Sequence, residues 1–377
     1  MNKTVALSTL ALALVAACSQ EHNVTGLAAD RAVGLNASAV ASNADAPGAV
    51  YALTNQAINA VAIFARGADG SLTWQTNVAT GGTGAGSGLG SQGALALSDD
   101  GRWLFGVNAG SNDVSAFRVT ASGLELTGRV SSGGVRPISL TLHGNVLYVL
   151  NAGGDGNISG FTVGTDGELA AISGSTRALS GTNVGPAQVA FSPDGQRLVV
   201  TEKTTNRLDV FTVAGDGVAS TATSIASAGG TPFGFAFGRR DELFVSEAAG
   251  SASSYVFAHD GSLTVASGAV LTHQGAPCWA VVTQNGKFGY TANAQGGSIS
   301  GFAIGTDGSI SLIDADGRTA VVGGGNIDLA LSGNSRYLYQ LNGDRSISGF
   351  RIEADGHLTP AGRSVTLPAS TVGLVAR

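Results

Sequence analysis

The 377-residue sequence is poor in cysteine, tryptophan, histidine and charged residues. It contains two cysteines, three tryptophans and five histidines, and only 12% of its residues are charged. A formal net charge of −6 with scattered basic residues excludes a nucleic-acid-binding surface, which needs a basic stripe to displace counterions. The motifs G-x-S-x-G, H-E-x-x-H, C-x-x-C and the Walker loop are absent. We therefore expect neither a metal nor a cofactor.

The start of the chain has the layout of an export signal. Lys3 precedes an apolar stretch from Val5 to Val15 that is too short to span a bilayer. The residues Val15-Ala16-Ala17-Cys18 resemble a bacterial lipobox. We predict a lipoprotein signal peptide over residues 1–17 and lipidation of Cys18. Ser19 indicates sorting to an outer membrane facing the periplasm; an ordinary signal peptide cut near Ala17 is the alternative.

Residues 18–48 are rich in Ala, Ser and Asn without periodicity, which predicts a flexible tether. No later apolar run is long enough to cross a membrane, so the membrane is reached only through lipidated Cys18. If Cys18 carries lipid, Cys278 has no other cysteine to pair with. A buried thiol of this kind is usually a small apolar core residue.

The remaining chain, residues 49–377, is organised by one repeated phrase. It occurs almost unchanged three times, as ISGFTVGTDGEL, ISGFAIGTDGSI and ISGFRIEADGHL. With looser copies the phrase occurs seven times, and its aromatic residue falls at Phe64, Phe117, Phe161, Phe211, Phe257, Phe302 and Phe350. The period of about 48 residues is typical of propellers and solenoids. Each copy predicts a β-hairpin around an Asp-Gly turn.

Two apolar strands joined by a tight turn precede most copies, so one repeat predicts four antiparallel strands, which is one propeller blade. The first copy, at Phe64, lacks the strand that should come first. Residues 368–375 have the pattern of such a strand and nothing follows them. We therefore predict an all-β, seven-bladed propeller closed by the C-terminal strand. The glycine shared by the phrases, as in Gly160 and Gly349, predicts a close approach of the adjacent blade.

Counting hairpins assigns the loops to two ends of the ring. Residues that end strand two and residues that precede strand one share one end, here called the top. The residue that ends strand two is Thr54, Asn108, Asn151, Glu202, Glu247, Asn293 or Asn342 in the successive blades. Asparagine there caps a turn, but glutamate does so poorly. Glu202 and Glu247 are therefore candidate acid–base residues, the alternative being rim carboxylates or ion pairs with Lys203 or Arg207.

His273 is the one histidine predicted on the top, and it is a candidate general base. The loop before strand one of the third blade contributes Arg136, a candidate anion contact. Asn151, Gln188 and Lys203 share this end and complete a candidate substrate-binding set.

Three segments together resemble a known family. They are FSPDGQRLVVTEKTTNRLDVF from Phe191 to Phe211, the LYVLN segment ending at Asn151, and the phrase GTDGEL. They resemble the lactonase seven-bladed propeller family, which includes bacterial 6-phosphogluconolactonase-like proteins and fungal carboxymuconate cyclisation enzymes. In active members, strand one of the central blades typically starts Gly-Pro-Arg-His and strand two ends Asn-Glu. Here Ala187 and Gln188 replace the Arg and His, while Glu202 retains the acid.

Two functional hypotheses follow. The resemblance implies a hydrolase of a small, polar, sugar-acid type of lactone in the cell envelope, with Glu202, Glu247 and His273 in acid–base roles. The missing Arg and His instead favour a non-catalytic, lipid-anchored propeller that binds a small molecule or an envelope protein on its top face.

Overall fold

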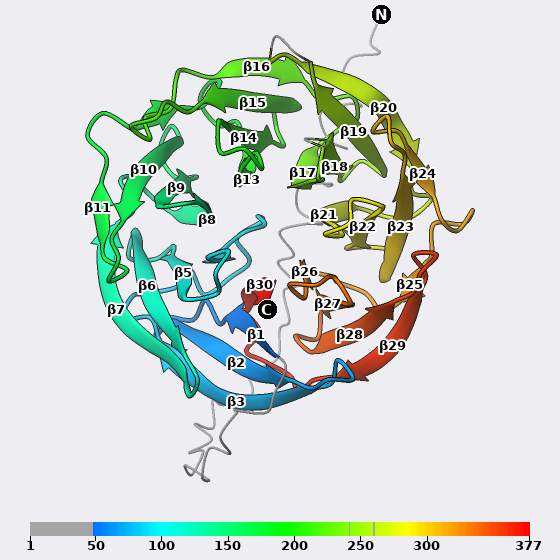
Figure 1. Cartoon of the computed structure of the whole chain (residues 1–377), viewed down its shortest axis with the longest axis horizontal. Coiled ribbons are helices and arrows are strands. Elements are labelled where there is room, and N and C mark those ends of the chain that lie inside the picture. The colour runs from blue at the N-terminus through cyan, green and yellow to red at the C-terminus, as the bar shows by residue number, and fades with distance from the viewer. Residues whose placement is uncertain (1–47, 241, 259–260) are drawn as a thin grey trace, which may run out of the picture.

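The computed structural model describes residues 48–240, 242–258 and 261–377. These residues form seven antiparallel sheets arranged around a common centre (Figure 1). No helix in the described ranges is long and apolar enough to span a membrane. The prediction of an all-β, seven-bladed propeller is confirmed.

The strands of each blade are given from the innermost outward. Blade 1 contains β30 (Val372–Ala376), β1 (Gly48–Leu53), β2 (Ala60–Arg66) and β3 (Leu72–Ala79). Blade 2 contains β4 (Leu95–Leu97), β5 (Trp103–Asn108), β6 (Asp113–Thr120) and β7 (Gly123–Ser131). Blade 3 contains β8 (Pro137–His143), β9 (Val146–Asn151), β10 (Asn157–Val163) and, both on β10, β11 (Leu169–Ala171) and β12 (Arg177–Ala178).

Blade 4 contains β13 (Pro186–Phe191), β14 (Arg197–Glu202), β15 (Arg207–Thr212) and β16 (Thr223–Ala226). Blade 5 contains β17 (Pro232–Phe237), β18 (Glu242–Glu247), β19 (Ser251–Phe257) and β20 (Leu263–Leu271). Blade 6 contains β21 (Pro277–Val282), β22 (Phe288–Asn293), β23 (Ser298–Ile304) and, both on β23, β24 (Ile310–Leu312) and β25 (Ala320–Val321). Blade 7 contains β26 (Asp328–Leu331), β27 (Tyr337–Leu341), β28 (Ile347–Ile352) and β29 (Leu358–Arg363).

Burial follows the radial position of each strand. The second strands, such as β9, are buried on both faces because neighbouring blades cover them. The outer strand β3 instead mixes exposed and partly buried residues. All seven aromatic residues of the repeated phrase lie in the third strand of their blade. The repeat in the sequence is therefore the repeat of the blades.

The ring is closed by the C-terminal strand, as predicted. In blade 1, β30 pairs antiparallel with β1, and Tyr51 lies opposite Val375. The two strands are adjacent near the centre of the ring (Figure 1). Val372 and Leu374 of β30 are buried in the core. Residues at opposite ends of the sequence thus form one sheet.

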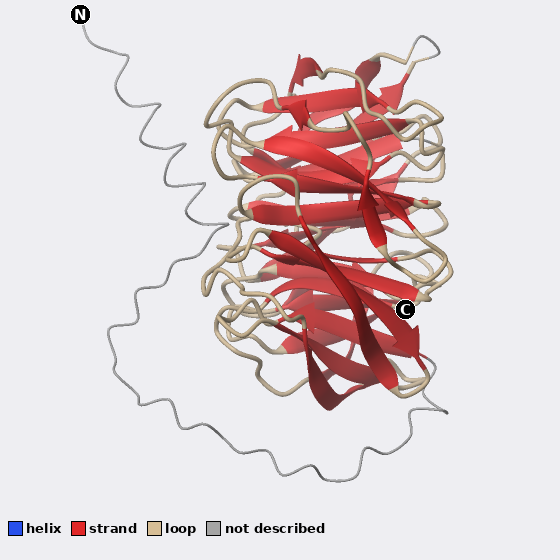
Figure 2. Cartoon of the chain, turned by 90° about the vertical axis from the view of Figure 1, so that its left-hand side faces the viewer, coloured by secondary structure: helices blue, strands red, loops and turns tan. Residues whose placement is uncertain are grey.

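Loops lie on two opposite faces of the ring, and the strands run between them (Figure 2). The strand pairing places the ends of the second strands and the segments before the innermost strands on one face, the top. The Asp-Gly turns of the phrases lie on the other face; the turn glycines Gly167, Gly308 and Gly356 have positive φ angles between 83° and 90°. The predicted assignment of the loops is correct.

The predicted close approach of the adjacent blade occurs at Gly349, where a Cβ atom would lie 3.3 Å from the carbonyl oxygen of Gly70 in blade 1, but the phrase glycine also accommodates a tyrosine of its own blade. A Cβ atom on Gly160 would lie 2.8 Å from the Tyr148 ring, which belongs to the paired strand of the same blade. The Tyr148 hydroxyl donates to the carbonyl of Gly217 in blade 4 at 2.8 Å. In blade 7, Tyr339 lies opposite Gly349 in the same way and donates to Gly70 of blade 1. The glycine makes room for a tyrosine that joins two blades.

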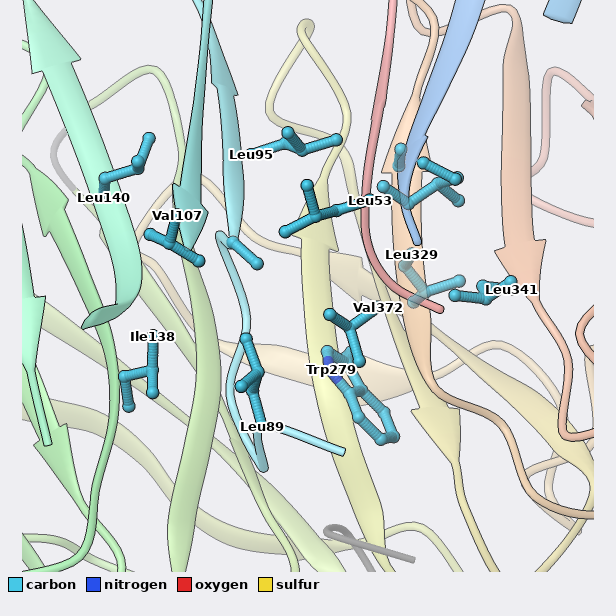
Figure 3. Close-up of a cluster of buried hydrophobic side chains, with 14 of the residues drawn as sticks. Leu53, Leu89, Leu95, Val107, Ile138, Leu140, Trp279, Leu329, Leu341 and Val372 are labelled. Carbon is cyan, nitrogen blue, oxygen red and sulfur yellow. The ribbon is translucent and has the colours of Figure 1, made fainter. Parts of the chain in front are cut away.

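The central channel is crossed by residues 87–93, a glycine-rich segment before β4 that we call the plug. The Ser91 hydroxyl donates to the carbonyl of Ile138 in blade 3 at 2.8 Å. The backbone N–H of Gln92 donates to the carbonyl of Ala187 in blade 4 at 3.2 Å. From blade 6, Trp279 Nε1 donates to the carbonyl of Ser91 at 2.9 Å. Figure 3 shows Leu89 of the plug between Ile138 and Trp279. The plug therefore fills the top of the channel.

Ring closure makes a prediction for stability. Leu374→Ala should lower the free energy of unfolding by about 2–5 kcal/mol, the usual cost of a cavity at a buried leucine. Chemical denaturation would measure it. Leu126→Ala is the matched control, since Leu126 lies on the outer strand β7 and is 41% exposed; it should cost at most about 1 kcal/mol. Equal effects of the two substitutions would contradict a structural role for β30.

Candidate functional site

The two candidate glutamates are fully buried, with a relative exposure of 0%. Glu202 accepts hydrogen bonds from the backbone N–H of Ser180 at 3.0 Å and from the hydroxyls of Ser180 and Thr205, both at 2.5 Å. Glu202 is therefore not a solvated carboxylate on the rim. It also forms no ion pair with Lys203, whose amine donates to the carbonyls of Gly90 and Pro186.

Glu247 occupies the same position in blade 5. It accepts from the backbone N–H of Gly229 at 2.7 Å and from the hydroxyls of Ser251 and Ser253, both at 2.5 Å. In blade 2 the corresponding Asn108 donates to Asp113 and Ser115 and accepts from Thr80. The residue that ends the second strand therefore ties together the start of the third strand and the loop from the preceding blade. A glutamate with enough hydroxyl and N–H donors can do this as well as an asparagine.

Glu202 differs from Glu247 by having a second carboxylate beside it. Asp209 is also fully buried, and the N–H of Ser180 that donates to Glu202 donates to Asp209 as well, at 2.9 Å. The Ser224 hydroxyl donates to the other Asp209 oxygen. Burial, and then the hydrogen bond with Glu202, raise the pKa of Asp209 from 3.8 to about 7. The hydrogen bond between the two carboxyl groups needs a proton on one of them, and the raised pKa of Asp209 favours that proton.

A cavity of about 500 Å³ opens on the top face between the plug and blades 3 and 4. Its floor is residues 88–90 of the plug. One wall is blade 3, with Arg136, Ile138, Ala152 and residues 154–156, and the other is blade 4, with residues 183–186 and Lys203. Two of the predicted binding residues, Arg136 and Lys203, therefore line one cavity.

Lys203 is the buried basic group of this cavity, with a relative exposure of 8%. Its Nζ donates to the carbonyl of Gly90 at 2.5 Å and to the carbonyl of Pro186 at 3.1 Å, and it lies 5.0 Å from the centre of the Phe233 ring. Burial, and then the positive charge of Arg136, lower the pKa of Lys203 from 10.5 to about 7. A substantial fraction of the amine is neutral at physiological pH, which suits a general base.

Arg136 provides an exposed positive charge at the mouth of the cavity. Its backbone has a φ angle of 55°, its N–H donates to the side chain of Asn112 at 2.7 Å, and its carbonyl accepts from Ala152 at 2.9 Å. These bonds hold the strained backbone in place. Asp155 and Asn183 also line the cavity. Sequence reasoning missed both, although each sits in a Gly-rich top loop between predicted strands.

The other predicted site residues do not line this cavity. Gln188 is 7% exposed, and its side chain bonds to the N–H and the carbonyl of Phe235 in blade 5, at 2.8 Å and 3.0 Å. Asn151 is fully buried and donates to Ser132 and Asn157. His273 is exposed on the top loop before β21, away from the residues of the cavity.

A second cavity of about 900 Å³ opens on the bottom face, where Asp99 and Asp100 of one turn face the C-terminal Arg377. No group of three or more His, Cys, Asp and Glu side chains able to hold a metal ion occurs among the described residues. Cys278 is fully buried on β21. The signal peptide over residues 1–17, the lipidated Cys18 and the tether up to residue 47 lie outside the described residues.

The order of the strands and the closure of the ring define a seven-bladed β-propeller. Residues 47–184 match the family described as lactonase, 7-bladed β-propeller, which is the family that the sequence resembles. A search of curated proteins gave no match.

Solved structures show the same fold. A protein described as a putative 6-phosphogluconolactonase from Bacteroides fragilis has 19% identity and a TM-score of 0.71, over 89% of this chain and 99% of that chain. A periplasmic gluconolactonase from Pseudomonas aeruginosa has 19% identity and a TM-score of 0.69, over 87% and 99%. A protein from Lactobacillus plantarum has 18% identity and a TM-score of 0.71, over 88% and 99%. At these identities the likeness concerns the fold.

The carboxyl pair makes a prediction for the pH dependence of stability. Because the pKa of Asp209 is higher in the folded chain than in the unfolded chain, the folded chain binds more protons between about pH 4 and pH 7. The melting temperature should therefore contain a contribution that falls as the pH rises through this range. Glu202→Gln removes the second of the two causes of the raised pKa and should reduce that slope, which thermal melts at several pH values would measure.

Glu247→Gln is the matched control for this experiment. Glu247 holds the same position in blade 5, but its hydrogen-bond donors are a backbone N–H and hydroxyls. The slope should remain in this variant. The same slope in wild type and Glu202→Gln would contradict a contribution of Glu202 to the raised pKa of Asp209.

Proposed function

We propose that the protein hydrolyses a small, polar, sugar-acid type of lactone in the cavity between the plug and blades 3 and 4. The observation that carries the proposal is Lys203, a buried amine with a pKa lowered to about 7 in a top-face cavity that also holds Arg136. The combination offers a base and a fixed positive charge, which are the two groups that lactone opening requires. The described fold neighbours include one protein called a gluconolactonase and one called a putative 6-phosphogluconolactonase.

In the proposed reaction, a water molecule from solvent attacks the carbonyl carbon of the lactone. The neutral Nζ of Lys203 takes a proton from this water as the new C–O bond forms. Arg136 stabilises the oxyanion of the tetrahedral intermediate. The ring C–O bond then breaks, and the departing ring oxygen takes the proton back from the Lys203 ammonium. The product is an open hydroxy acid, which releases its carboxyl proton to solvent; the resulting carboxylate pairs with Arg136.

This assignment differs from the roles implied by the family resemblance. Glu202 and Glu247 are held in buried hydrogen bonds between blades, and Gln188 spans to blade 5. The positions where active relatives carry Arg and His are Ala187 and Gln188, and neither lines the cavity. Lys203 directly follows Glu202, the last residue of β14; it begins the next turn and lines the cavity. The proposed base is therefore the neighbour of the residue that the resemblance favours.

The proposed location is the cell envelope. The lipobox-like sequence ending at Cys18 supports export and lipid anchoring, and one neighbour of the same fold is described as periplasmic. The lipid would hold the chain at the outer membrane, with the propeller facing the periplasm. Substrate would then reach the cavity from the periplasmic solution.

A non-catalytic binding module is the second candidate. The observation that favours it is that both candidate acid–base glutamates are buried between blades and fully hydrogen-bonded. In this case Arg136 and Lys203 would bind the anionic group of a small molecule or of an envelope protein without turnover.

Replacing the proposed base separates these functions. Lys203→Met keeps the length of the side chain and removes the amine, so kcat/KM for lactone hydrolysis should fall by about 10²–10⁴-fold. In the wild type, kcat/KM should rise with pH through about 7, as Lys203 loses its proton. A panel containing glucono-δ-lactone and 6-phosphogluconolactone, followed by pH-stat titration, would measure both.

Lys287→Met is the matched control, because Lys287 is an exposed residue of a bottom turn. It should leave the rates unchanged. Hydrolysis that is equal in wild type and Lys203→Met would overturn the proposed mechanism. No hydrolysis of any lactone, with calorimetric binding of a sugar acid that is lost in Lys203→Met, would establish the binding module instead.

A further inference from the structure

In blades 3 and 4, one position on the innermost strand bridges to the next blade. In blade 3 this residue is Ser139, whose hydroxyl accepts from the N–H of Val189 in blade 4 at 3.2 Å. In blade 4 it is Gln188, whose amide bonds to both the N–H and the carbonyl of Phe235 in blade 5. Such bonds satisfy backbone groups that face the channel on edge strands. In blade 5 the position is Gly234, which has no side chain to reach Ala280 of blade 6.

Gln92 of the plug supplies the missing bridge. Its Nε2 donates to the carbonyl of Ala280 at 2.7 Å, and its Oε1 accepts from the N–H of Ala280 at 2.9 Å. A Cβ atom on Gly234 would lie 2.1 Å from Gln92 Oε1. The amide of Gln92 therefore occupies the space that a side chain at position 234 would fill. The bond pattern is the one that Gln188 makes one blade earlier.

The bridge fixes the floor of the candidate cavity. Gln92 lies two residues after Gly90, whose carbonyl accepts from Lys203 Nζ. Between them, the carbonyl of Ser91 accepts from Trp279 of blade 6. A path of three consecutive residues thus connects blade 6, across the channel, to the amine of Lys203 in blade 4.

We propose that Gln92 is a positioning residue for the cavity: by tying the plug to β21, it holds the carbonyl of Gly90 against Lys203 and keeps water away from that amine. The inference rests on the proposed function of Lys203. It assigns a role in the site to a residue on the far side of the plug, which does not itself line the cavity.

Other charged groups around Lys203 act on it from the neighbouring elements. Arg136 of blade 3 lowers its pKa, and Asp155 of the same blade lines the cavity. Glu202 is the preceding residue and is bonded to Ser180 and Thr205. None of these groups is removed when Gln92 is replaced. A change in the pKa of Lys203 in such a variant would therefore result from a change in the position of the plug.

The test is Gln92→Ala, with Gln188→Ala as matched control. Both variants lose an amide that bonds to both backbone groups of a neighbouring innermost strand, but Gln188 makes no bond to the plug. The readout is the pH titration of the lysine Cε chemical shifts in protein labelled with 13C-lysine. The sequence contains only three lysines, Lys3, Lys203 and Lys287, so Lys203 can be assigned with Lys203→Met.

In Gln92→Ala, we expect the midpoint of Lys203 to move upward by about one pH unit or more, because water reaches the amine. The rising limb of kcat/KM should move in the same direction, and kcat/KM at pH 7 should fall about tenfold. Gln188→Ala should leave the midpoint near that of the wild type. An unchanged midpoint in folded Gln92→Ala, or an equal shift in both variants, would overturn the proposal.

Gly234→Ala gives a second approach if Gln92→Ala fails to fold. The added Cβ displaces the Gln92 amide without removing it, so the midpoint should again rise; a midpoint that stays near 7 would count against the proposal. The NMR titration needs no substrate, so it separates the two proposals. A shifted midpoint with no lactone hydrolysed by any variant would support the positioning role of Gln92 and refute the proposed function. An unshifted midpoint with lactone hydrolysis that depends on Lys203 would support the proposed function and refute the positioning role.

Discussion

The innermost strand of every blade is an edge strand, and its backbone groups facing the channel need hydrogen-bond partners. This requirement explains the chemistry of the channel better than any catalytic pattern does. Ser139, Gln188 and Gln92 each bond to the backbone of the next innermost strand. Between blades 7 and 1 the bridging residue is Asp328, which accepts from the N–H of Leu374 on the closing strand. Burial raises the pKa of Asp328 well above its usual value, and its carboxyl group joins the last blade to the first.

Tyrosines provide a second set of bonds between blades, nearer the bottom face. Tyr148, Tyr290 and Tyr339 each lie opposite a phrase glycine and donate to a turn carbonyl of the following blade. A ring lying over glycine buries a large apolar area, and the hydroxyl supplies a directed bond at its end. The repeated phrase thus encodes the packing between blades as well as the hairpin.

The sequence was sufficient to predict the features that follow from the spacing of the repeated phrase. The spacing of the phrase predicted the blades, and the unmatched strand after Leu367 predicted ring closure. It was not sufficient for features that depend on burial. Glu202 and Lys203 are consecutive in the sequence. Only the packed structure shows that the acid is buried in hydrogen bonds while the amine lines a cavity. The plug was not predicted, because residues 87–93 show no strand-like or helix-like hydrophobic pattern and their glycines are typical of turns. Gln188 was placed on the correct end of the ring, but its side-chain amide forms hydrogen bonds with the backbone of Phe235 in blade 5 and does not reach the cavity.

The closing strand β30 comprises Val372–Ala376, within the last six residues of the chain. During synthesis β30 is made after β4–β29, all of which follow the other three strands of blade 1 along the chain. The first blade therefore remains a three-stranded sheet, with β1 unpaired on its inner side, until β30 has been made. A chain cut before Val372 lacks the innermost strand of blade 1, so the last strand of the propeller decides whether the ring can close.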